Sequence, residues 1–353
     1  MAGGVTPIRG GDVNDKHRTA GLPADPLLGA RAVSRAARAD ELKRQLAPVS
    51  LASMFAEVLA EAKAARPVIG ASLGHYKLDK YLCGLRRGNI TTLGARTSFG
   101  KTSKALQVAH LCMRDGGKPL FISCEDSRIL CAKRFMSLRA KVNALRLRAN
   151  QCRNDELERI EAEVALAETF PFFANGIGVP VEDICDMIRQ HCREHDSPVV
   201  IVDYLQCIQV RRKQNDRRNE VGYIANELSA AIKQSNAAGL LLSQMRRAQA
   251  GVREHAPTMD ELKESGDIEN ASEHVLLGWA EAIKDAQGNI TGKTRRMQIA
   301  KNKDGPSVEE WLDLEFDSVT ASIKEVRGEL VDDPYGLDDM HDDFQDLSER
   351  RHP

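Results

Sequence analysis

Apolar residues form two alternating patterns along the central part of the chain. Short, nearly uninterrupted apolar runs are typical of strands buried on both faces of a sheet. They lie at Ile90–Leu93, Leu120–Ser123, Val199–Val202, Leu240–Leu242, Val275–Leu277 and Met297–Ala300. Between these runs, apolar residues recur at helical spacing in Ser103–Arg114, Glu156–Ala167, Val181–Glu194 and Glu220–Ala237. The alternation predicts an α/β fold in which a mainly parallel sheet lies between helices.

The two ends of the chain lack this alternation. Apolar residues recur at helical spacing from Ser50 to Ala65, and Pro67 then ends that helix. The residues before it show no sustained apolar period and predict a flexible arm, whereas clustered acids at the other end predict a disordered tail. The expected divisions are an arm (1–49), a linker helix (50–69), one central domain (70–324) and an acidic tail (325–353).

Composition and cysteine usage narrow the class of protein. The 353 residues are 42% hydrophobic, which is enough to bury a core and excludes a wholly disordered chain. No run approaches the ~18 apolar residues of a membrane-spanning helix, so we expect no membrane partner. The eight cysteines show no CxxC spacing, which favours reduced thiols and a cytoplasmic protein.

Charge is unevenly distributed, although the net charge is only −1. Ten acids and three arginines give the tail (325–353) a charge of −7, which leaves +6 on the rest of the chain. Residues 127–154 hold eight basic residues and no acid, and five more basic residues fall between Arg211 and Arg218. Such stretches suit a surface that binds a polyanion, although solvated helix faces and loops have the same composition.

The segment from Asn89 to Thr102 has the pattern of a phosphate-binding loop. A strand runs into a loop of small residues, then Gly-Lys-Thr, then a helix. Loop amides and the helix N-terminus would donate to phosphate oxygens, Lys101 would reach the β- and γ-phosphates, and the Thr102 hydroxyl would coordinate Mg²⁺. The loop departs from the usual pattern at Ala95, where glycine is expected. The predicted ATP-binding residues are Ala95, Arg96, Thr97, Ser98, Phe99, Gly100, Lys101, Thr102 and Ser103.

Two acids at strand ends extend the expected site. Asp203 ends a buried apolar run, the position from which a carboxylate holds Mg²⁺ through water; the alternative is an aspartate that caps the next turn. Glu125 follows the strand Leu120–Ser123 and is a candidate to orient the attacking water, with an ordinary surface acid as the alternative.

The ordered motifs resemble one family, the RecA-like motor domain of DnaB-type replicative helicases. The similarity runs from about Gly70 to Phe316, and in that family the phosphate-binding loop also commonly begins with alanine, as at Ala95. The other matching segments are Gly84-Leu85 with Gly88, Ser123-Cys124-Glu125, Asp203-Tyr204-Leu205-Gln206, Leu242-Ser243-Gln244-Met245, Leu262 to Asn270 and Ala300 to Pro306. The resemblance implies a RecA-like P-loop NTPase fold.

The resemblance also implies which residues act. Lys101 and Gln244 would contact the triphosphate, and Glu125 would be the catalytic glutamate. Lys301 and Lys303 would reach the nucleotide of a neighbouring subunit. Thr102 and Asp203 would hold the metal. The implied DNA-binding residues are Lys263, Glu264 and Gly266, joined by Arg211, Arg212 and Arg217 of the basic stretch.

Two departures from the family change the expectation. The family has an arginine where this chain has Lys303, which brings positive charge without the planar, bidentate guanidinium. Weaker hydrolysis or a contribution from Arg295 or Arg296 is therefore expected. The second departure is the family's N-terminal scaffold domain, which we expect to be missing because residues 1–69 are too short and too polar for it.

The implied activity is that of an ATP-dependent and Mg²⁺-dependent helicase, moving 5′ to 3′ on single-stranded DNA in replication. The implied assembly is a homo-oligomeric ring, a hexamer, with a primase, a loader or another replisome protein as partner. A helicase without the scaffold suits phage or mobile-element replication in a bacterial or phage-infected cytosol. The DNA candidates contain no aromatic residue, so we expect salt-dependent contacts to the DNA backbone.

Two other functions fit the same motifs. A recombination-type or clock-type ATPase of this fold would hydrolyse ATP without unwinding a duplex, and unwinding of a forked DNA separates it from a helicase. A loader or defence protein would use ATP to control its oligomeric state. Complete assembly with a non-hydrolysable analogue, together with negligible turnover, would indicate this last function.

Overall fold

The structure is a computed structural model of the 353-residue chain. It describes residues 47–63, 70–167, 172–212, 216–245, 255–262, 266–285, 287, 290–305 and 308–326. The chain divides into two compact units, residues 1–65 and 66–353. Most of the predicted arm and nearly all of the predicted acidic tail lie outside the described residues.

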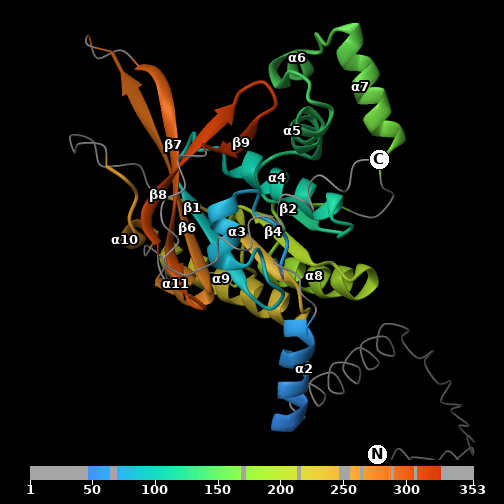
Figure 1. Ribbon diagram of the computed structural model, residues 1–353, viewed down its shortest axis with the longest axis vertical. Coiled ribbons are helices and arrows are strands. Elements are labelled where there is room, and N and C mark those ends of the chain that lie inside the picture. The colour runs from blue at the N-terminus through green and yellow to red at the C-terminus, as the bar shows by residue number, and fades with distance from the viewer. Residues whose placement is uncertain are drawn as a thin grey trace, which may run out of the picture. The chain divides into compact units, whose positions relative to one another are not determined.

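In the described part of the larger unit, nine strands form one sheet (Figure 1), in the order β3-β2-β4-β5-β1-β6-β7-β8-β9. The strands are β1 (Ile90–Ala95), β2 (Leu120–Ser123), β3 (Phe173–Asn175), β4 (Val199–Asp203), β5 (Ala238–Gln244), β6 (His274–Lys284), β7 (Ile290–Asn302), β8 (Val308–Asp317) and β9 (Ser322–Glu325). The helices are α3 (Tyr76–Leu82), α4 (Lys101–Arg114), α5 (Arg128–Ala140), α6 (Ala144–Ala149), α7 (Asn154–Ala165), α8 (Val181–His195), the 3₁₀ turn η1 (Leu205–Cys207), α9 (Arg217–Gln234), α10 (Met259–Leu262) and α11 (Gly266–Ala271). No helix among the described residues is long and apolar enough to cross a membrane.

The predicted mainly parallel sheet is confirmed. Strands β1 to β6 are mutually parallel, and β7, β8 and β9 extend the sheet in antiparallel fashion. All six predicted strands are present, and β2 coincides with the predicted Leu120–Ser123. The predictions Val275–Leu277 and Met297–Ala300 were too short, because β6 and β7 form a long hairpin of 11 and 13 residues.

Alternate residues of the central strands pack in two separate cores, one on each face of the sheet. In β4, Val200 and Val202 pack in the core that contains α8 and α9, whereas Val199 and Ile201 pack in the core that contains α4 (Figure 1). Side chains of a strand point alternately to opposite faces, so a strand covered on both sides must be apolar throughout. This explains the uninterrupted apolar runs of the sequence.

The smaller unit has one described helix, α2 (Leu51–Lys63), within the span predicted from Ser50 to Ala65. Its apolar stripe is exposed: Leu51, Phe55 and Val58 have accessibilities of 62%, 64% and 63%. An amphipathic helix of this length gains most of its stability by burying such a stripe.

Phe99 anchors the loop between β1 and α4 in the core. Its side chain is fully buried, and its ring lies against Gly278 of β6. A Cβ atom at residue 278 would lie 2.8–2.9 Å from three atoms of the Phe99 ring. The close approach therefore requires glycine at this position.

Gly278→Ala is expected to destabilise the protein by roughly 1–3 kcal/mol, because the new methyl group overlaps the Phe99 ring in a packed core. Chemical denaturation measures the loss. Gly292→Ala in β7 is the matched control, since its added Cβ would meet only Ile283, at 3.4 Å. Its effect should stay within about 0.5 kcal/mol. Equal losses in both variants would contradict the role assigned to Gly278.

Candidate nucleotide-binding site

The predicted phosphate-binding loop connects β1 to α4 at the carboxyl edge of the parallel strands. Ser98 and Gly100 have positive φ angles of 71° and 102°, and glycine adopts the second without strain. Helix α4 begins at Lys101, so the amides of its first turn have no carbonyl partner within the helix. A loop of this shape before a helix N-terminus is suited to bind phosphate.

Lys101 lies between two fixed acceptors. Its Nζ donates to the carbonyl oxygen of Ala95 at 2.9 Å and to Oε1 of Gln244 at 3.4 Å. Both acceptors are available because β1 and β5 pair with Ala95 opposite Gln244. Burial lowers the pKa of Lys101, and the carboxylates of Asp203 and Glu125 oppose this shift. A partly desolvated ammonium in this position favours an anionic partner.

Asp203 ends β4 and is only 2% exposed. Its carboxylate accepts a hydrogen bond from the Thr102 side chain, yet Oδ1 is buried without a hydrogen-bond partner. Burial raises the pKa of Asp203 to about 6, against the effect of the Thr102 hydrogen bond; Asp126 and Glu125 raise it further, and Lys101 lowers it. A buried carboxylate oxygen without a donor can be satisfied by a metal ion or by water bound to one.

Glu125 lies at the same edge of the sheet. Strands β2 and β4 pair with Ser123 opposite Asp203, and the amide of Cys124 donates to the Asp203 carbonyl at 2.6 Å. Glu125 follows directly, is exposed to solvent, and acts electrostatically on both Lys101 and Asp203. The structure therefore brings together five predicted site residues: Lys101, Thr102, Glu125, Asp203 and Gln244.

Lys301 and Lys303 lie elsewhere. Lys301 lies near the end of β7 and Lys303 directly follows this strand, whose antiparallel course returns the chain to the amino edge of the sheet. Lys301 Nζ donates to the Glu269 carbonyl at 2.6 Å, and Lys303 Nζ lies 3.7 Å from Oε1 of Glu273. Lys301 is thus hydrogen-bonded within its own chain, whereas Lys303 is exposed and only lies near a carboxylate at this edge.

The backbone ladder shows how far these lysines are from the phosphate-binding loop. The backbone amide of Lys303 donates to the carbonyl of Glu273. The backbone amide of Glu273 in turn donates to the carbonyl of Ile90, at the start of β1. Lys303 is therefore level with Ile90, five residues or ~16 Å along the strand direction from Ala95. Neither lysine reaches the phosphate-binding loop of its own chain.

Arg96, one of the predicted ATP-binding residues, has its guanidinium engaged within the chain. It donates to the carbonyl of His255 at 2.7 Å and to Oε1 of Glu261 in α10 at 2.6 Å. The side chain is 8% exposed and its Nε has no hydrogen-bond partner. The charge of Arg96 is therefore balanced by Glu261, and this pair ties the loop to residues 255–262.

No pattern in the sequence indicated that Arg295 of β7 contacts this loop. Its Nε donates to the Phe99 carbonyl at 3.0 Å and its Nη2 to the Ser98 carbonyl at 3.4 Å. The guanidinium also lies 4.0 Å from the ring centroid of Phe316, a cation–π contact. Weaker hydrolysis, or a contribution from Arg295 or Arg296, was expected from the lysine at position 303, and this stays a prediction. Within its own chain Arg295 contacts the phosphate-binding loop, and Arg296 pairs with Asp313 and Glu281.

Four of the six DNA-binding candidates lie among the described residues. Lys263 and Glu264 lie outside the described residues, and Gly266 is the first residue of α11. The Arg211 guanidinium pairs with Asp183, and Arg217 pairs with Glu220 and donates to the carbonyl of Gln206. Arg212 is exposed.

The basic stretch 127–154 forms α5, α6 and the start of α7. At least three of its eight basic residues pair with acids. These pairs are Arg134–Asp126, Arg139–Glu163 and Arg146–Glu156. The pairing favours the interpretation of this stretch as ordinary helix faces over that of a polyanion surface.

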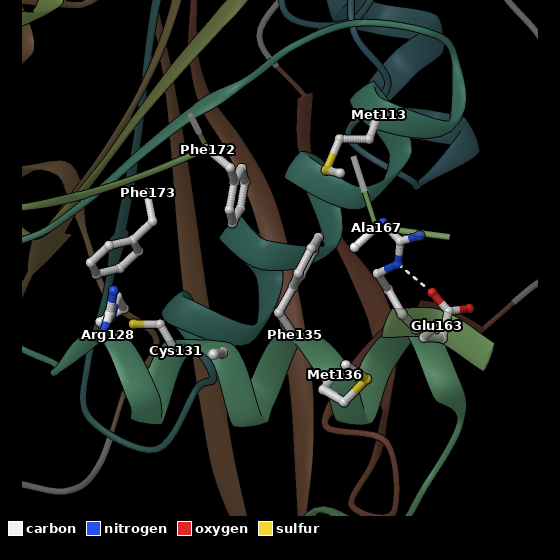
Figure 2. A pocket seen from close by; sticks show the side chains of 11 residues that line it. Met113, Arg128, Cys131, Phe135, Met136, Glu163, Ala167, Phe172 and Phe173 are labelled. Atoms are coloured by element: carbon white, nitrogen blue, oxygen red, sulfur yellow. Dashed lines mark hydrogen bonds and ion pairs between the residues drawn. The ribbon is translucent and has the colours of Figure 1, made fainter. Parts of the chain in front are cut away.

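An apolar cavity of about 230 Å³ lies beside α5, lined by the rings of Phe135, Phe172 and Phe173 (Figure 2). Met113, which also lines it, is twelve residues along α4 from Lys101, or ~18 Å. The lining of the cavity is largely apolar, and its charged members are Arg128 and the ion-paired Arg139 and Glu163. It therefore lacks the converging polar groups of the carboxyl edge and does not suit a triphosphate.

The carboxyl edge fits ATP with Mg²⁺. Among the described residues, no three His, Cys, Asp or Glu side chains cluster as a metal site. Mg²⁺ in nucleotide sites needs only one or two protein ligands, because water and phosphate supply the others. Thr102 and Asp203, with its unpartnered Oδ1, match that requirement, and Lys101 matches the phosphates.

This fold, with a phosphate-binding loop after a central strand and acids at the ends of β2 and β4, defines a RecA-like P-loop ATPase domain. The model of one family, the DnaB-like helicase C terminal domain, matches residues 70–325. The chain belongs to this family, and the resemblance found in the sequence is confirmed.

Similar proteins include replicative helicases. A "Probable replicative DNA helicase" of Trieres chinensis is 27% identical over 270 residues, which cover 73% of this chain and 58% of that protein. The "Replicative DNA helicase DnaB" of Rickettsia prowazekii (strain Madrid E) is 29% identical over 245 residues, 66% of this chain and 50% of that protein. The chain thus spans about half the length of the curated relatives it matches.

Solved structures show the same fold. The structure of an ATPase domain has a TM-score of 0.69 and 22% identity, covering 80% of this chain and 100% of that one. The structure of a DnaB-like replicative helicase, described together with its interactions with primase, has a TM-score of 0.68 and 21% identity, covering 85% of this chain and 76% of that one.

Asp203→Asn is expected to stabilise the metal-free protein at neutral and higher pH. Burial raises the pKa of Asp203 from 3.8 to about 6. Ionised Asp203 therefore costs about 3 kcal/mol of folding free energy above pH ~6, and this cost disappears as the pH falls toward ~4. Thermal unfolding with a chelator measures Tm for both proteins across this range. The gain in Tm should shrink as the pH falls; a gain independent of pH would contradict the prediction.

Proposed function

We propose that this chain is the motor part of a ring-shaped, ATP-dependent DNA helicase that moves along single-stranded DNA during replication. Membership of the DnaB-like helicase C-terminal domain family supports the helicase class. One of the similar solved helicases is described with its interactions with primase, and we extend that kind of partner to this chain.

One observation carries the proposal of a ring. Lys301 and Lys303 lie at the edge of the sheet opposite to the phosphate-binding loop of their own chain. If these lysines act on a nucleotide, it must belong to another subunit. A contact of one edge with the opposite edge of the next copy is heterologous, and such contacts close into rings when the rotation permits. A hexamer is the ring implied by the family resemblance.

The residues of the carboxyl edge would divide the chemistry as follows. ATP with Mg²⁺, when bound, supplies the phosphoanhydride whose cleavage drives movement. Lys101 would balance phosphate charge, and Thr102 with Asp203 would hold Mg²⁺. Glu125 is exposed beside them and would orient a water molecule and accept its proton. Gln244, beside Lys101, would contact the γ-phosphate.

Lys303 would complete the site of the next subunit by bringing positive charge to the transferred phosphate. In the free chain the Nζ of Lys303 lies 3.7 Å from Oε1 of Glu273, and the Lys303 side chain is 65% exposed. Solvent therefore screens this ion pair, and the pair is weak. Lys303 can therefore leave Glu273 at little cost. Lysine has a single ammonium group where arginine has a planar, bidentate guanidinium. This difference supports a slow rate of ATP hydrolysis.

The domain division proposed from the sequence follows from this function. Residues 70–324 would form the motor, and the match of the family model over 70–325 supports these limits. Helix α2, with its exposed apolar stripe, would be the linker helix of residues 50–69. Gly266, with Lys263 and Glu264 just before it in the chain, and the basic residues Arg211, Arg212 and Arg217 would contact the DNA backbone.

Complementation between two inactive variants tests the shared site. Lys101→Ala removes the phosphate lysine, and Lys303→Ala removes the lysine offered to the neighbour; each variant alone should lose at least about a hundredfold in kcat. In a mixture of equal parts, some boundaries combine an intact loop with an intact Lys303. ATPase activity, measured with single-stranded DNA, should then recover to about a quarter of the wild-type rate if boundaries act independently.

Each variant alone, at the total protein concentration of the mixture, is the control. If mixing the two variants restores no activity, although native mass shows that they co-assemble, the shared site is wrong. If wild-type ATPase is not stimulated by single-stranded DNA at low salt, translocation is wrong. Full assembly with a non-hydrolysable analogue, combined with negligible turnover, would favour the assembly protein instead.

A further inference from the structure

Gln206, in the turn η1 after β4, holds the end of β5 through its side-chain amide. Its Oε1 accepts from the backbone amide of Gln244 at 3.0 Å. Its Nε2 donates to Oγ of Ser243 at 2.9 Å and to the carbonyl of Gln244 at 3.3 Å. The amide of Gln206 therefore binds both backbone polar groups of Gln244, as a neighbouring strand would.

These hydrogen bonds restrict the backbone conformation of Gln244, the residue proposed to contact the γ-phosphate. Gln244 is the last residue of β5, where the strand ladder no longer holds the chain on both sides. With its amide and carbonyl both bound by Gln206, its backbone dihedrals are fixed, and so is the direction in which its side chain leaves β5. That side chain has its Oε1 3.4 Å from Nζ of Lys101.

Gln206 also contacts the basic segment that follows it. The guanidinium of Arg217 donates to the backbone carbonyl of Gln206. Arg217 is the first residue of α9, and it also forms an ion pair with Glu220 in the same helix, at 2.7 Å. Gln206 thus contacts Gln244, the residue proposed to bind the γ-phosphate, with its side chain. With its backbone carbonyl it contacts Arg217, which is proposed to contact DNA.

We propose that Gln206 is a positioning residue that aligns Gln244 for the γ-phosphate and connects it to Arg217. The inference rests on the proposed function, because it assigns Gln206 a part in the same site. It explains why a glutamine stands where an apolar residue of equal length would fill the same space: the three hydrogen bonds need both a donor and an acceptor.

Gln206→Met tests the alignment, because methionine has a similar length but cannot form these hydrogen bonds. Binding of fluorescent ADP and of a fluorescent non-hydrolysable ATP analogue is measured by titration. The ADP affinity should stay within about twofold, since Gln244 is assigned only to the γ-phosphate. The preference for the triphosphate should fall by about tenfold, the effect of losing one aligned hydrogen bond to a charged group.

Gln209→Met is the matched control. It makes the same replacement three residues further on, at an exposed side chain. It should leave both affinities unchanged. Ser243→Ala removes one of the three hydrogen bonds and should cause a smaller loss of triphosphate preference. Because both changes act through the same amide, Ser243→Ala should add nothing in the Gln206→Met background.

The connection to Arg217 has its own measurement. The affinity for a fluorescent oligo-dT strand is compared in ADP and in the non-hydrolysable analogue. Gln206→Met should reduce the ratio of these two affinities by several-fold, whereas Gln209→Met should preserve it. By linkage, the DNA strand must change the affinity for the analogue relative to ADP by the same factor, which provides an internal check.

The outcomes separate the inference from the proposed function. If Gln206→Met weakens ADP and the analogue equally, its role is only structural and the inference is overturned. An unchanged triphosphate preference in Gln206→Met also overturns the inference. An unchanged ratio of the DNA affinities in ADP and in the analogue overturns the connection to Arg217. If the wild-type protein shows neither a triphosphate preference nor nucleotide-dependent DNA binding, the proposed function itself fails.

Discussion

Two opposite charges buried at one edge of the sheet, Lys101 and Asp203, determine how the rest of the site is built. Burial lowers the pKa of Lys101 and raises that of Asp203, so each charged form is disfavoured by its surroundings. The fold compensates only in part, with carbonyl and amide oxygens for the ammonium and the Thr102 hydroxyl for the carboxylate. A ligand that brings an anion to Lys101 and a cation to Asp203 relieves both costs together. A metal–nucleotide complex is such a ligand.

This arrangement depends on strand register. Ala95 stands opposite Gln244, and Ser123 stands opposite Asp203, so the strands and the loop deliver their polar groups to one level. The parallel strands are apolar throughout because both faces are covered, and polar chemistry can begin only where each strand ends. Lys101, Thr102, Glu125 and Asp203 could therefore be located from the sequence, since each follows a recognisable apolar run.

Other strands and contacts could not be predicted from the sequence, for physical reasons. In β8, Leu312 and Leu314 are buried while Asp313 and Glu315 are exposed, so the strand has one solvated face and no apolar run. β3 has three residues, too few for any period. Arg295 contacts a loop 196 residues away in the chain, and no local pattern marks such a contact. Gln206 lay inside a recognised motif, but its bonds to Ser243 and Gln244 depend on the pairing of β4 with β5.

Strand β7 connects the two edges of the sheet. Arg295 binds the carbonyls of the phosphate-binding loop from one part of this strand, and Lys301 stands near its end, six residues or ~20 Å away. β7 is bonded to β6 on one side and to β8 on the other, so it moves as part of a sheet. If Lys303 serves the next subunit, a shift of the loop in one subunit is carried by Arg295 and β7 to the site of its neighbour. In the proposed ring, the strand that carries Lys301 away from the phosphate-binding loop of its own chain would also link successive sites.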